Sequence, residues 1–434
     1  MQTSARAEWH RLTDVMIHRP GAEMFFGLME PYSFLYERAF SMNDAVFEHT
    51  ELEHALSEAG VTVRRLKRFA VEVATHTPDV VERLRSVAEK IVHYSGPKEM
   101  VTRARRALHR NISTFDPETL FNILLLRPSV RLQRRPGARG ILPTVELDCP
   151  LANLYFMRDQ QALTAGGFVL GRMSKPQRAD EPMVAGNVLR IAGAQIAGQV
   201  KAPGTFEGGD FMPLGEFALL GTGDRTNSSG VRQVLAMPHG FDEVGVVHQP
   251  AHPALPDDAP DPMIDMHLDT YFNIAGNGVA VGSEILLRAA RVDVYRRSGR
   301  GPLVRDSKKR TLPEYLAEKK FEVIPLSSLE QMSYATNFLC LRDRSIVAVE
   351  VEEEVDRVLG GLVVAARRDP HRYGKLLALV QRERKELREG RGFFPHTADV
   401  RDRGIKVTPL SLQEITGGYG GAHCMTCVME RTAQ

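Results

Sequence analysis

The stretch FEGGDFMPLGEFALLGTG, Phe206–Gly223, carries two short apolar runs that are separated by a glycine turn. Short apolar runs bounded by turn residues are typical of β-strands, so the stretch predicts a hairpin. The segment SSGVRQVLA follows with helical character, and the apolar run VGVVHQP comes after it. The region therefore predicts two strands, a helix and a further strand in succession.

Similar successions occur on both sides of this stretch. Near the start of the chain, DVMIHRPG and VTVRRL indicate strands around a helix that begins at an Asn43 cap and ends at Gly60. Further along, HLDTYFNIAGNGVAVG, LPEYLAEKK and FEVIPLS again suggest strands, a helix and a strand, and no repeat at a fixed sequence period accompanies them. Recurring hairpins, helices and strands predict an α/β fold rather than a β-sandwich.

Two segments interrupt this alternation with long helices. Between residues 78 and 126 the apolar side chains follow a helical period. We predict a first part of the α/β fold at 1–76, an inserted helical subdomain at 77–140 and the remainder of the fold at 141–434. A further helical insertion is expected at about 352–392 within that remainder.

The composition of the 434-residue chain is that of an ordinary globular protein, with 43% hydrophobic and 25% charged residues. The net charge is only +2, and no apolar run is long enough to cross a bilayer, so we expect neither a nucleic-acid nor a membrane partner. Four cysteines are too few for a disulfide framework, and the N-terminal segment lacks the apolar core of a secretory signal. A cytoplasmic location is therefore expected.

Residues capable of chemistry occur next to several of the short strands. Each of them alone is most often a turn former, but together they supply a thiol, a base and several carboxylates, as covalent catalysis on a cationic substrate requires. The candidates, which we expect at strand ends or in the terminal loop, are Asp159, Glu207, Asp210, His267, Asp269 and Cys424.

The tripeptide HLD allows two functional interpretations and one without a function. In a strand, His267 and Asp269 would point to the same face and could serve one site, although an ordinary solvated strand face fits the spacing equally. Asp265, His267 and Asp269 are also spaced like the ligands of a dinuclear metal hydrolase that cleaves guanidines. Against the metal reading, the chain has no second Asp-x-Asp cluster, and Phe211 stands where such an enzyme would have histidine.

The terminal stretch GGYGGAHCMTC, Gly417–Cys427, raises three alternatives for Cys424. A zinc site would need a fourth ligand beyond His423, Cys424 and Cys427, and redox chemistry would prefer the Cys-x-x-C motif at a helix start. A glycine-rich loop instead lets a thiol approach a planar group closely. The loop therefore favours a nucleophilic Cys424.

The motifs NLYFMRD, FEGGDF, GDRTNSSG, HLDTYF and GGAHCMTC resemble, in order and approximate spacing, those of arginine deiminases of the guanidine-modifying (amidinotransferase) superfamily. The resemblance runs from about Leu12 to Cys427. It implies a five-bladed, pseudo-symmetric α/β propeller of ββαβ units with an inserted helical subdomain and a central active site. It also implies no metal and no cofactor, and a small guanidino substrate such as L-arginine.

The resemblance also assigns roles to individual residues. Cys424 resembles the nucleophile that attacks the guanidinium carbon, and His267 resembles the general acid and base. Asp159 and Asp269 resemble the carboxylates that bind the guanidinium nitrogens, and Glu207 resembles the glutamate that favours imidazolium, whereas Asp210 is assigned to a turn. Imidazolium or the bound cation would then lower the pKa of the thiol. The residues that match a substrate pocket are Asn153 and Phe156, with Arg172 and Arg225 for the α-carboxylate.

The implied reaction converts L-arginine and water to L-citrulline and ammonia through an S-alkylthiouronium intermediate on Cys424. The chain departs from the family pattern at Tyr419, where the loop commonly carries arginine, and in RDQQ, which replaces Arg-Asp-Pro. An amidinotransferase, or a hydrolase of another guanidino compound or modified arginine, is therefore the alternative. A binding protein that kept the pocket and a metal-dependent ureohydrolase are further alternatives, and a homo-oligomer stays open.

Overall fold

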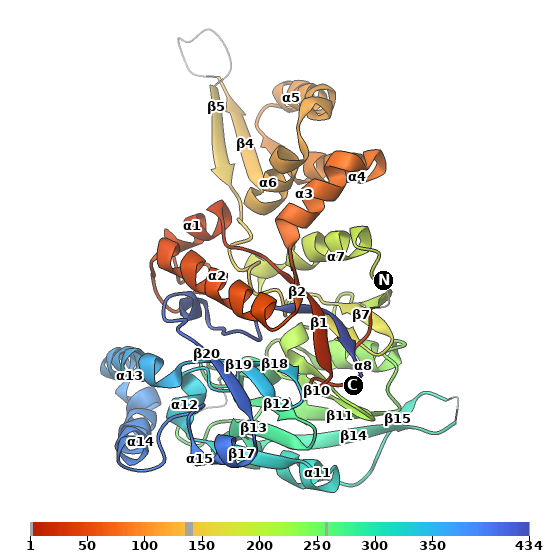
Figure 1. Cartoon of the computed structure of the whole chain (residues 1–434). Coiled ribbons are helices and arrows are strands. Elements are labelled where there is room, and N and C mark those ends of the chain that lie inside the picture. Colours follow the sequence, from red (N-terminus) through yellow and green to blue (C-terminus); the bar gives the residue numbers. More distant parts are fainter. Residues whose placement is uncertain (1–2, 135–141, 257–258, 300, 434) are drawn as a thin grey trace.

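The computed structural model describes residues 3–134, 142–256, 259–299 and 301–433. Its chain is a mixed α/β fold in which β21 (Cys427–Thr432), the last strand, pairs antiparallel with β1 (Arg11–Ile17), the first. On its other side β1 pairs in parallel with β2 (Thr62–Arg65), and α2 (Met42–Glu58) connects the two. The two ends of the chain thus share one sheet (Figure 1).

Four more units have the same organisation, with an antiparallel strand pair followed by a helical connection to a parallel strand. The second unit consists of β6 (Gln161–Thr164), β7 (Gly167–Leu170), α7 (Glu181–Ile191) and β8 (Ile196–Gln199). The third consists of β9 (Phe211–Leu214), β10 (Phe217–Thr222), α8 (Ser228–Ala236) and β11 (Glu243–His248), and this is the succession predicted from Phe206–Gly223.

The remaining two units complete the set. The fourth consists of β12 (Phe272–Gly276), β13 (Val279–Ser283), α10 (Glu284–Ala289), α11 (Leu312–Glu318) and β17 (Glu322–Leu326), and its connection includes β14 (Arg291–Arg297), which adds to the third sheet beside β11. The fifth consists of β18 (Leu339–Arg342), β19 (Ser345–Val349), α13 (Val351–Arg368), α14 (Pro370–Glu389), α15 (Ala398–Asp402) and β20 (Lys406–Leu410). The expected insertion at about 352–392 corresponds to the hairpin of α13 and α14.

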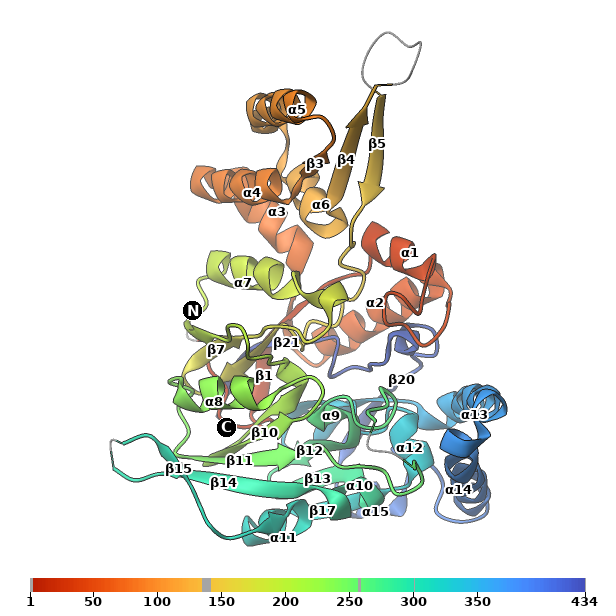
Figure 2. The same ribbon diagram turned by 180° about the vertical axis from the view of Figure 1, so that it is seen from behind.

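The segment between the first and second units projects from the rest of the molecule, as Figure 2 shows from behind. It contains both helices and a three-stranded sheet: α3 (Leu66–His76), α4 (Pro78–Ile91), β3 (His93–Ser95), α5 (Lys98–Asn111), α6 (Pro117–Leu126), β4 (Pro128–Gln133) and β5 (Leu142–Leu147). The predicted boundary at residues 140 and 141 lies outside the described residues.

Local chemistry explains where these elements begin. Helix α2 begins two residues earlier than predicted. Its N-cap is Ser41, not Asn43, because the Ser41 side chain accepts a hydrogen bond from the Asp44 N–H. Buried apolar side chains then hold the units together in two large clusters, one around the first and second units and the inserted segment, the other around the fourth and fifth.

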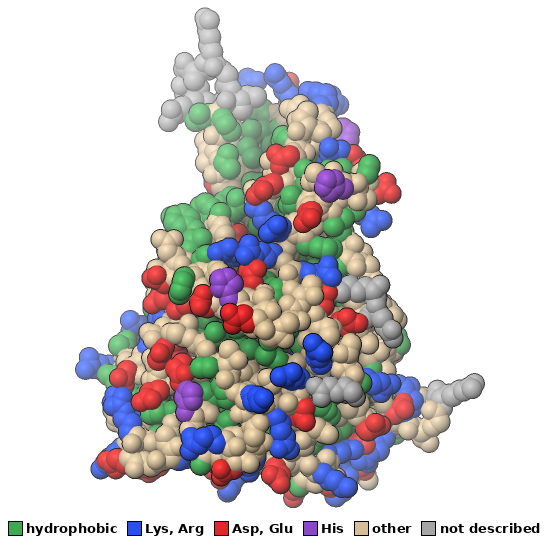
Figure 3. All heavy atoms as spheres, in the orientation of Figure 1, with side chains coloured by type: hydrophobic (Ala, Val, Ile, Leu, Met, Phe, Trp, Pro, Cys, Tyr) green, Lys and Arg blue, Asp and Glu red, His purple; other side chains and the backbone are tan. Residues whose placement is uncertain are grey.

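On the face shown in Figure 3, Lys and Arg side chains are interspersed with Asp and Glu side chains. Among the described residues, no helix combines the length and the apolar character that a membrane span requires.

Candidate active site

Turns, rather than strand ends, position the polar residues that the sequence singled out. Asp159 lies in a series of turns before β6, and Glu207 precedes the short 3-10 turn that leads into β9. Backbone hydrogen bonds join these turns, because the Arg158 N–H donates to the Cys424 carbonyl and the Gly208 N–H donates to that of Asp159, both at 2.9 Å. Asp159, which was expected at the end of a strand, therefore lies in a turn instead.

The HLD segment also differs from its prediction. It is not a strand, because His267 is the residue before the short helix α9 (Leu268–Tyr271) and its N–H donates to the Thr270 hydroxyl at 3.1 Å. The Asp210 carboxylate accepts from the Leu268 N–H at 2.9 Å and so anchors this turn. His267 and Asp269 nevertheless reach one site, since the helix start directs both side chains toward the 207–210 turn.

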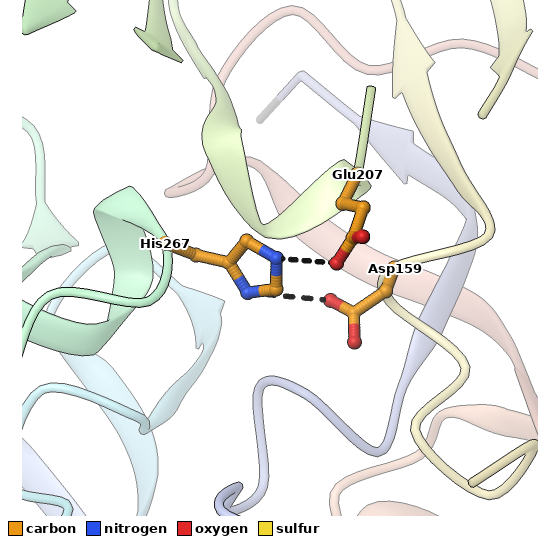
Figure 4. A group of neighbouring side chains, drawn as sticks. All are labelled: Asp159, Glu207 and His267. Atoms are coloured by element: carbon orange, nitrogen blue, oxygen red, sulfur yellow. Dashed lines mark hydrogen bonds and ion pairs between the residues drawn. The ribbon is translucent and has the colours of Figure 1, made fainter. Parts of the chain in front are cut away.

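The side chains of Asp159, Glu207 and His267 form a buried cluster, which Figure 4 shows. His267 Nε2 lies 2.8 Å from Glu207 Oε2. On the opposite side of the ring, His267 Nδ1 lies 3.8 Å from Asp159 Oδ1 and 4.0 Å from Asp269 Oδ1. The ring therefore stands between a glutamate and two aspartates.

The electrostatic balance of this cluster favours imidazolium. Burial opposes protonation of His267, but Asp159 and Glu207 outweigh it and raise the pKa of the imidazole to about 9. Burial likewise opposes ionisation of Glu207, but the hydrogen bond from His267 prevails and lowers the pKa of this carboxyl to about 2. At neutral pH the pair is an ion pair, which suits His267 to donate a proton.

The thiol of Cys424 lies on the other side of Asp269. Its Sγ is 3.6 Å from Asp269 Oδ2, and that oxygen also accepts from His423 Nδ1 at 2.8 Å. Burial, followed by the negative charges of Asp269 and Asp159, raises the pKa of the Cys424 thiol well above its usual range. This direction is opposite to the lowering of the thiol pKa that was expected from imidazolium, because burial and the two aspartates both raise it.

Asn337 is the residue that holds the thiol in place. Its Nδ2 donates to Cys424 Sγ at 3.0 Å, while its Oδ1 accepts from the N–H groups of Gly421 and Cys424 at 2.8 and 3.0 Å. A hydrogen bond from the amide favours the thiolate over the thiol. Asn337 lies outside the distinctive sequence motifs, and its surroundings, ATNFLCL, carry no signal beyond the start of a strand.

Two carboxylate oxygens at the centre of the site accept no hydrogen bond from the described residues. Asp159 Oδ1 and Asp269 Oδ1 are buried and have no hydrogen-bond donor among the described residues. Buried polar atoms are rarely left unpaired, since each one costs about 1–3 kcal/mol. Two unpaired acceptors near one imidazole and one thiol are suited to a planar cation with several N–H donors.

Glycines are required where the backbone crosses this cluster. A Cβ at Gly209 would lie 2.9 Å from His267 Nδ1 and 3.0 Å from Asp269 Oδ1. A Cβ at Gly420 would lie 2.6 Å from the Phe156 ring and 2.8 Å from Cys424 Cβ. The glycines of FEGGDF and of the terminal loop therefore let the backbone approach the catalytic candidates closely.

A cavity of about 220 Å³ lies beside the cluster. Its lining includes Asn153, Phe156 and Arg225, three of the four residues predicted for the substrate pocket, together with Tyr419 and Arg178. Arg178 connects the cavity to the cluster, because its NH1 donates to Asp159 Oδ2 at 2.6 Å. A larger cavity of about 760 Å³, between the 18–23 turn and the helices α3 and α6, contains none of the cluster residues.

Arg172, the fourth predicted pocket residue, lies elsewhere. It is exposed, is absent from the cavity lining, and donates from NH1 to the Gly204 carbonyl at 3.2 Å. The buried arginines that line the cavity are Arg178 and Arg225. Arg178, which the sequence motifs did not single out, also pairs with Glu181 at 2.8 Å.

The metal interpretation of HLD is not supported by the geometry. Asp265 accepts from the Asp261 N–H at 2.8 Å and belongs to no metal-like group among the described residues. Asp159, Glu207 and His267 do have ligand atoms within 4.8 Å of one another. In this structure the 2.8 Å contact joins His267 Nε2 to Glu207 Oε2, so these two groups are paired with each other.

The Cys-x-x-C interpretation is equally weak. All four cysteines are free thiols. Cys427 lies in strand β21, where it pairs with Met16 of β1, and His423 is occupied by Asp269. The histidine and the two cysteines therefore do not form a ligand set.

Comparisons with known proteins agree with this geometry. A family model described as arginine deiminase matches residues 32–431. The arginine deiminase of Halobacterium salinarum is 26% identical over 504 aligned positions, which cover 100% of this chain and 97% of that protein. The arginine deiminase of Treponema denticola is 23% identical over 463 positions, covering 98% and 97%.

Solved structures show the same mixed α/β fold. SxtG, an amidinotransferase of saxitoxin biosynthesis from Microseira wollei, is similar with a TM-score of 0.52 and 13% identity, covering 100% of this chain and 98% of that one. AgrE in its ternary complex with ornithine and NAD+ is similar with a TM-score of 0.51 and 13% identity, covering 97% of this chain and 40% of that one.

Proposed function

This chain belongs to the arginine deiminase family and is a hydrolase of C–N bonds in guanidino compounds, and on this basis we propose that it converts L-arginine to L-citrulline and ammonia through an S-alkylthiouronium intermediate on Cys424. The observation that carries the proposal is the pair of unpartnered buried oxygens, Asp159 Oδ1 and Asp269 Oδ1. A guanidinium ion would donate N–H groups to both, as carboxylates bind such cations bidentately.

The proposed first step is attack of Cys424 Sγ on the guanidinium carbon. The bound cation offsets the negative charges of Asp159 and Asp269, so it lowers the pKa of the thiol that those charges raise. As the C–N bond breaks, the imidazolium of His267 gives its proton to the departing nitrogen, which leaves as ammonia. The carbon remains bonded to sulfur as a thiouronium.

The second step regenerates the enzyme. His267, now neutral, accepts a proton from a water molecule that attacks the thiouronium carbon. The C–S bond then breaks, and the electron pair returns to Cys424 Sγ. The hydroxyl proton of the adduct passes to this sulfur and replaces the proton that the thiol released to solvent before its attack, so the products are citrulline and the free thiol. Glu207 stays ionised throughout, because its hydrogen bond to His267 holds its pKa near 2.

The substrate's amino-acid end would lie in the cavity of about 220 Å³. We assign its α-carboxylate to Arg225, with Arg178 as the residue that positions Asp159, and we withdraw Arg172 from this role because it does not line the cavity. Asn153 and Phe156 line the same cavity.

We also propose that the five ββαβ units are the blades of a closed α/β propeller around this site, with 77–140 as an insertion. Pairing of the last strand, β21, with the first, β1, supports closure, because it completes the first unit with the end of the chain.

The test is to incubate the protein with L-arginine and measure citrulline and ammonia, with and without an added amine acceptor. Equal amounts of the two products that do not change with the amine support hydrolysis. Transfer of the amidino group to the amine would instead establish the alternative, an amidinotransferase. Absence of both products, together with no labelling of Cys424 by a haloacetamidine, would refute catalysis.

A further inference from the structure

A second cavity, of about 470 Å³, adjoins the proposed substrate pocket. The two cavities share Tyr32 and Tyr419 in their linings. Tyr419 occupies the left-handed backbone region at φ 72° and separates the two spaces. The second cavity therefore lies directly beside the place where the substrate's amino-acid end would lie, with Tyr419 between them.

The far wall of this second cavity is the hairpin of α13 and α14, the insertion expected from the sequence. Val358, Leu362 and Val364 of α13, with Leu376 of α14, present apolar side chains to it, and Met263 closes it from the opposite loop. Tyr32 and Val364 are 67% and 46% exposed, which is unusual for large apolar side chains beside a cavity. Figure 1 places this hairpin at the edge of the molecule.

The hairpin also fixes the loop between the two cavities. The Tyr373 hydroxyl of α14 donates to Asp261 at 3.0 Å, and the residues that follow Asp261 line both cavities, with Pro262 in the smaller and Met263 in the larger. This hydrogen bond holds the loop against the hairpin, and the apolar part of the wall favours an apolar ligand group, although charged residues such as Arg357 and Arg368 line the rest.

Charge in the second cavity disfavours a free α-ammonium group. Its two lining carboxylates already have partners: Glu37 accepts from Arg357 at 2.8 Å, and Asp261 accepts from Tyr373. Tyr419 is neutral, whereas the terminal loop of the family commonly carries a charged residue at this position. A neutral amide bearing an apolar group fits this surrounding better than an ammonium ion does.

We propose that the enzyme acts on arginine whose α-amino nitrogen carries an apolar acyl group, and that the second cavity holds this group. The proposal rests on the guanidine chemistry proposed above and names its substrate class. The guanidinium reaches Asp159, Asp269 and Cys424, the carboxylate stays near Arg225, and the acyl group extends past Tyr419 against α13.

Two adjacent glycines of α13 supply a matched test. Gly361 lines the second cavity, and a Cβ there meets only Glu37 Oε1 at 3.5 Å, an ordinary contact. Gly360 does not line it, and a Cβ there meets nothing within 4 Å. Because glycine weakens a helix interior, phenylalanine is tolerated by the helix at either position.

The experiment compares kcat/KM for Nα-benzoyl-L-arginine and L-arginine in the wild type and in the Gly361→Phe and Gly360→Phe variants. We expect the wild type to prefer the benzoyl compound. Gly361→Phe should lower kcat/KM for that compound by about tenfold or more while changing the value for L-arginine by less than about twofold, and Gly360→Phe should change neither.

The outcomes separate the two proposals. Hydrolysis of L-arginine with no turnover of the benzoyl compound would overturn the inference and leave the guanidine chemistry standing. Equal effects of the two glycine variants would also overturn it, since the cavity would then have no part. If neither compound yields ammonia and Cys424 resists a haloacetamidine, the proposed function itself fails.

Discussion

Replacing Asn337 by aspartate should slow guanidine hydrolysis while leaving the fold largely intact. In the wild type, Asn337 Nδ2 donates to Cys424 Sγ at 3.0 Å, and Oδ1 accepts from two backbone N–H groups of the terminal loop. Aspartate has the same shape and keeps an oxygen for the loop. It replaces the donor at the sulfur by an acceptor.

The structure sets the size of the effect. A hydrogen bond to a charged group contributes about 1.5–3 kcal/mol, and each 1.36 kcal/mol of activation free energy changes a rate about tenfold. If the bond to the thiolate is lost, kcat/KM should fall by about 10- to 150-fold. In the Asn337→Ala control, two buried N–H groups also lose their acceptor, at about 1–3 kcal/mol each, so this variant should melt at a clearly lower temperature.

The assay measures initial rates of citrulline formation and, by mass spectrometry, the pH dependence of Cys424 alkylation by iodoacetamide. Aspartate should shift alkylation to higher pH, because it disfavours the thiolate. An Asn337→Asp variant with the wild-type rate and the wild-type alkylation profile would show that the amide does not act on the sulfur. A melting temperature as low as that of Asn337→Ala would mean that the lost activity reflects unfolding.

Three further results are expected. Cys424→Ser should reduce citrulline formation to background with an unchanged melting temperature, whereas Cys427→Ser should retain activity, because only the first thiol faces Asp269. Arg225→Ala should raise KM for L-arginine by about tenfold or more, and Arg172→Ala should leave it within about twofold, as expected if only the cavity-lining arginine binds the carboxylate. In the folded state the pKa of His267 is raised to about 9, whereas a histidine in the unfolded chain has a pKa of about 6.5. The stabilisation from its ion pair is therefore complete below about pH 6.5 and is lost as the pH rises through about 9. The difference in melting temperature between wild type and His267→Gln, measured calorimetrically, should therefore narrow between about pH 6 and about pH 10, and a constant difference would contradict the ion pair.

Local patterns were sufficient for much of the fold. Glycine turns and apolar runs predicted the hairpin and the following helix and strand around Phe206–Gly223, because these depend on neighbouring residues alone. The strand prediction for the HLD segment was wrong because its structure depends on residues outside the segment. Its alternation suggested a strand, but hydrogen bonds from Thr270 and from distant Asp210 fix it as the start of a helix.

The same contrast applies to the site. Residues inside distinctive motifs, such as Cys424 and His267, could be selected from the sequence, and the structure brings them around a shared Asp269. Asn337 and Arg178 could not, because their contacts span 87 and 19 residues and their local sequences are ordinary. Side chains that act by orienting others carry little signal of their own, and only the assembled fold reveals them.

The position of Asp269 explains why a thiol with a raised pKa suits this site. The carboxylates that would bind the cation are the same groups that disfavour the thiolate, so binding and deprotonation are coupled through one pair of charges. Linkage requires the coupling to be reciprocal: a guanidinium that lowers the pKa of Cys424 is itself bound more tightly by the thiolate. Under the proposed function, a neutral urea would gain nothing from this coupling, so the product would be held less strongly than the substrate, and the sulfur would become reactive only with a cation between the two aspartates.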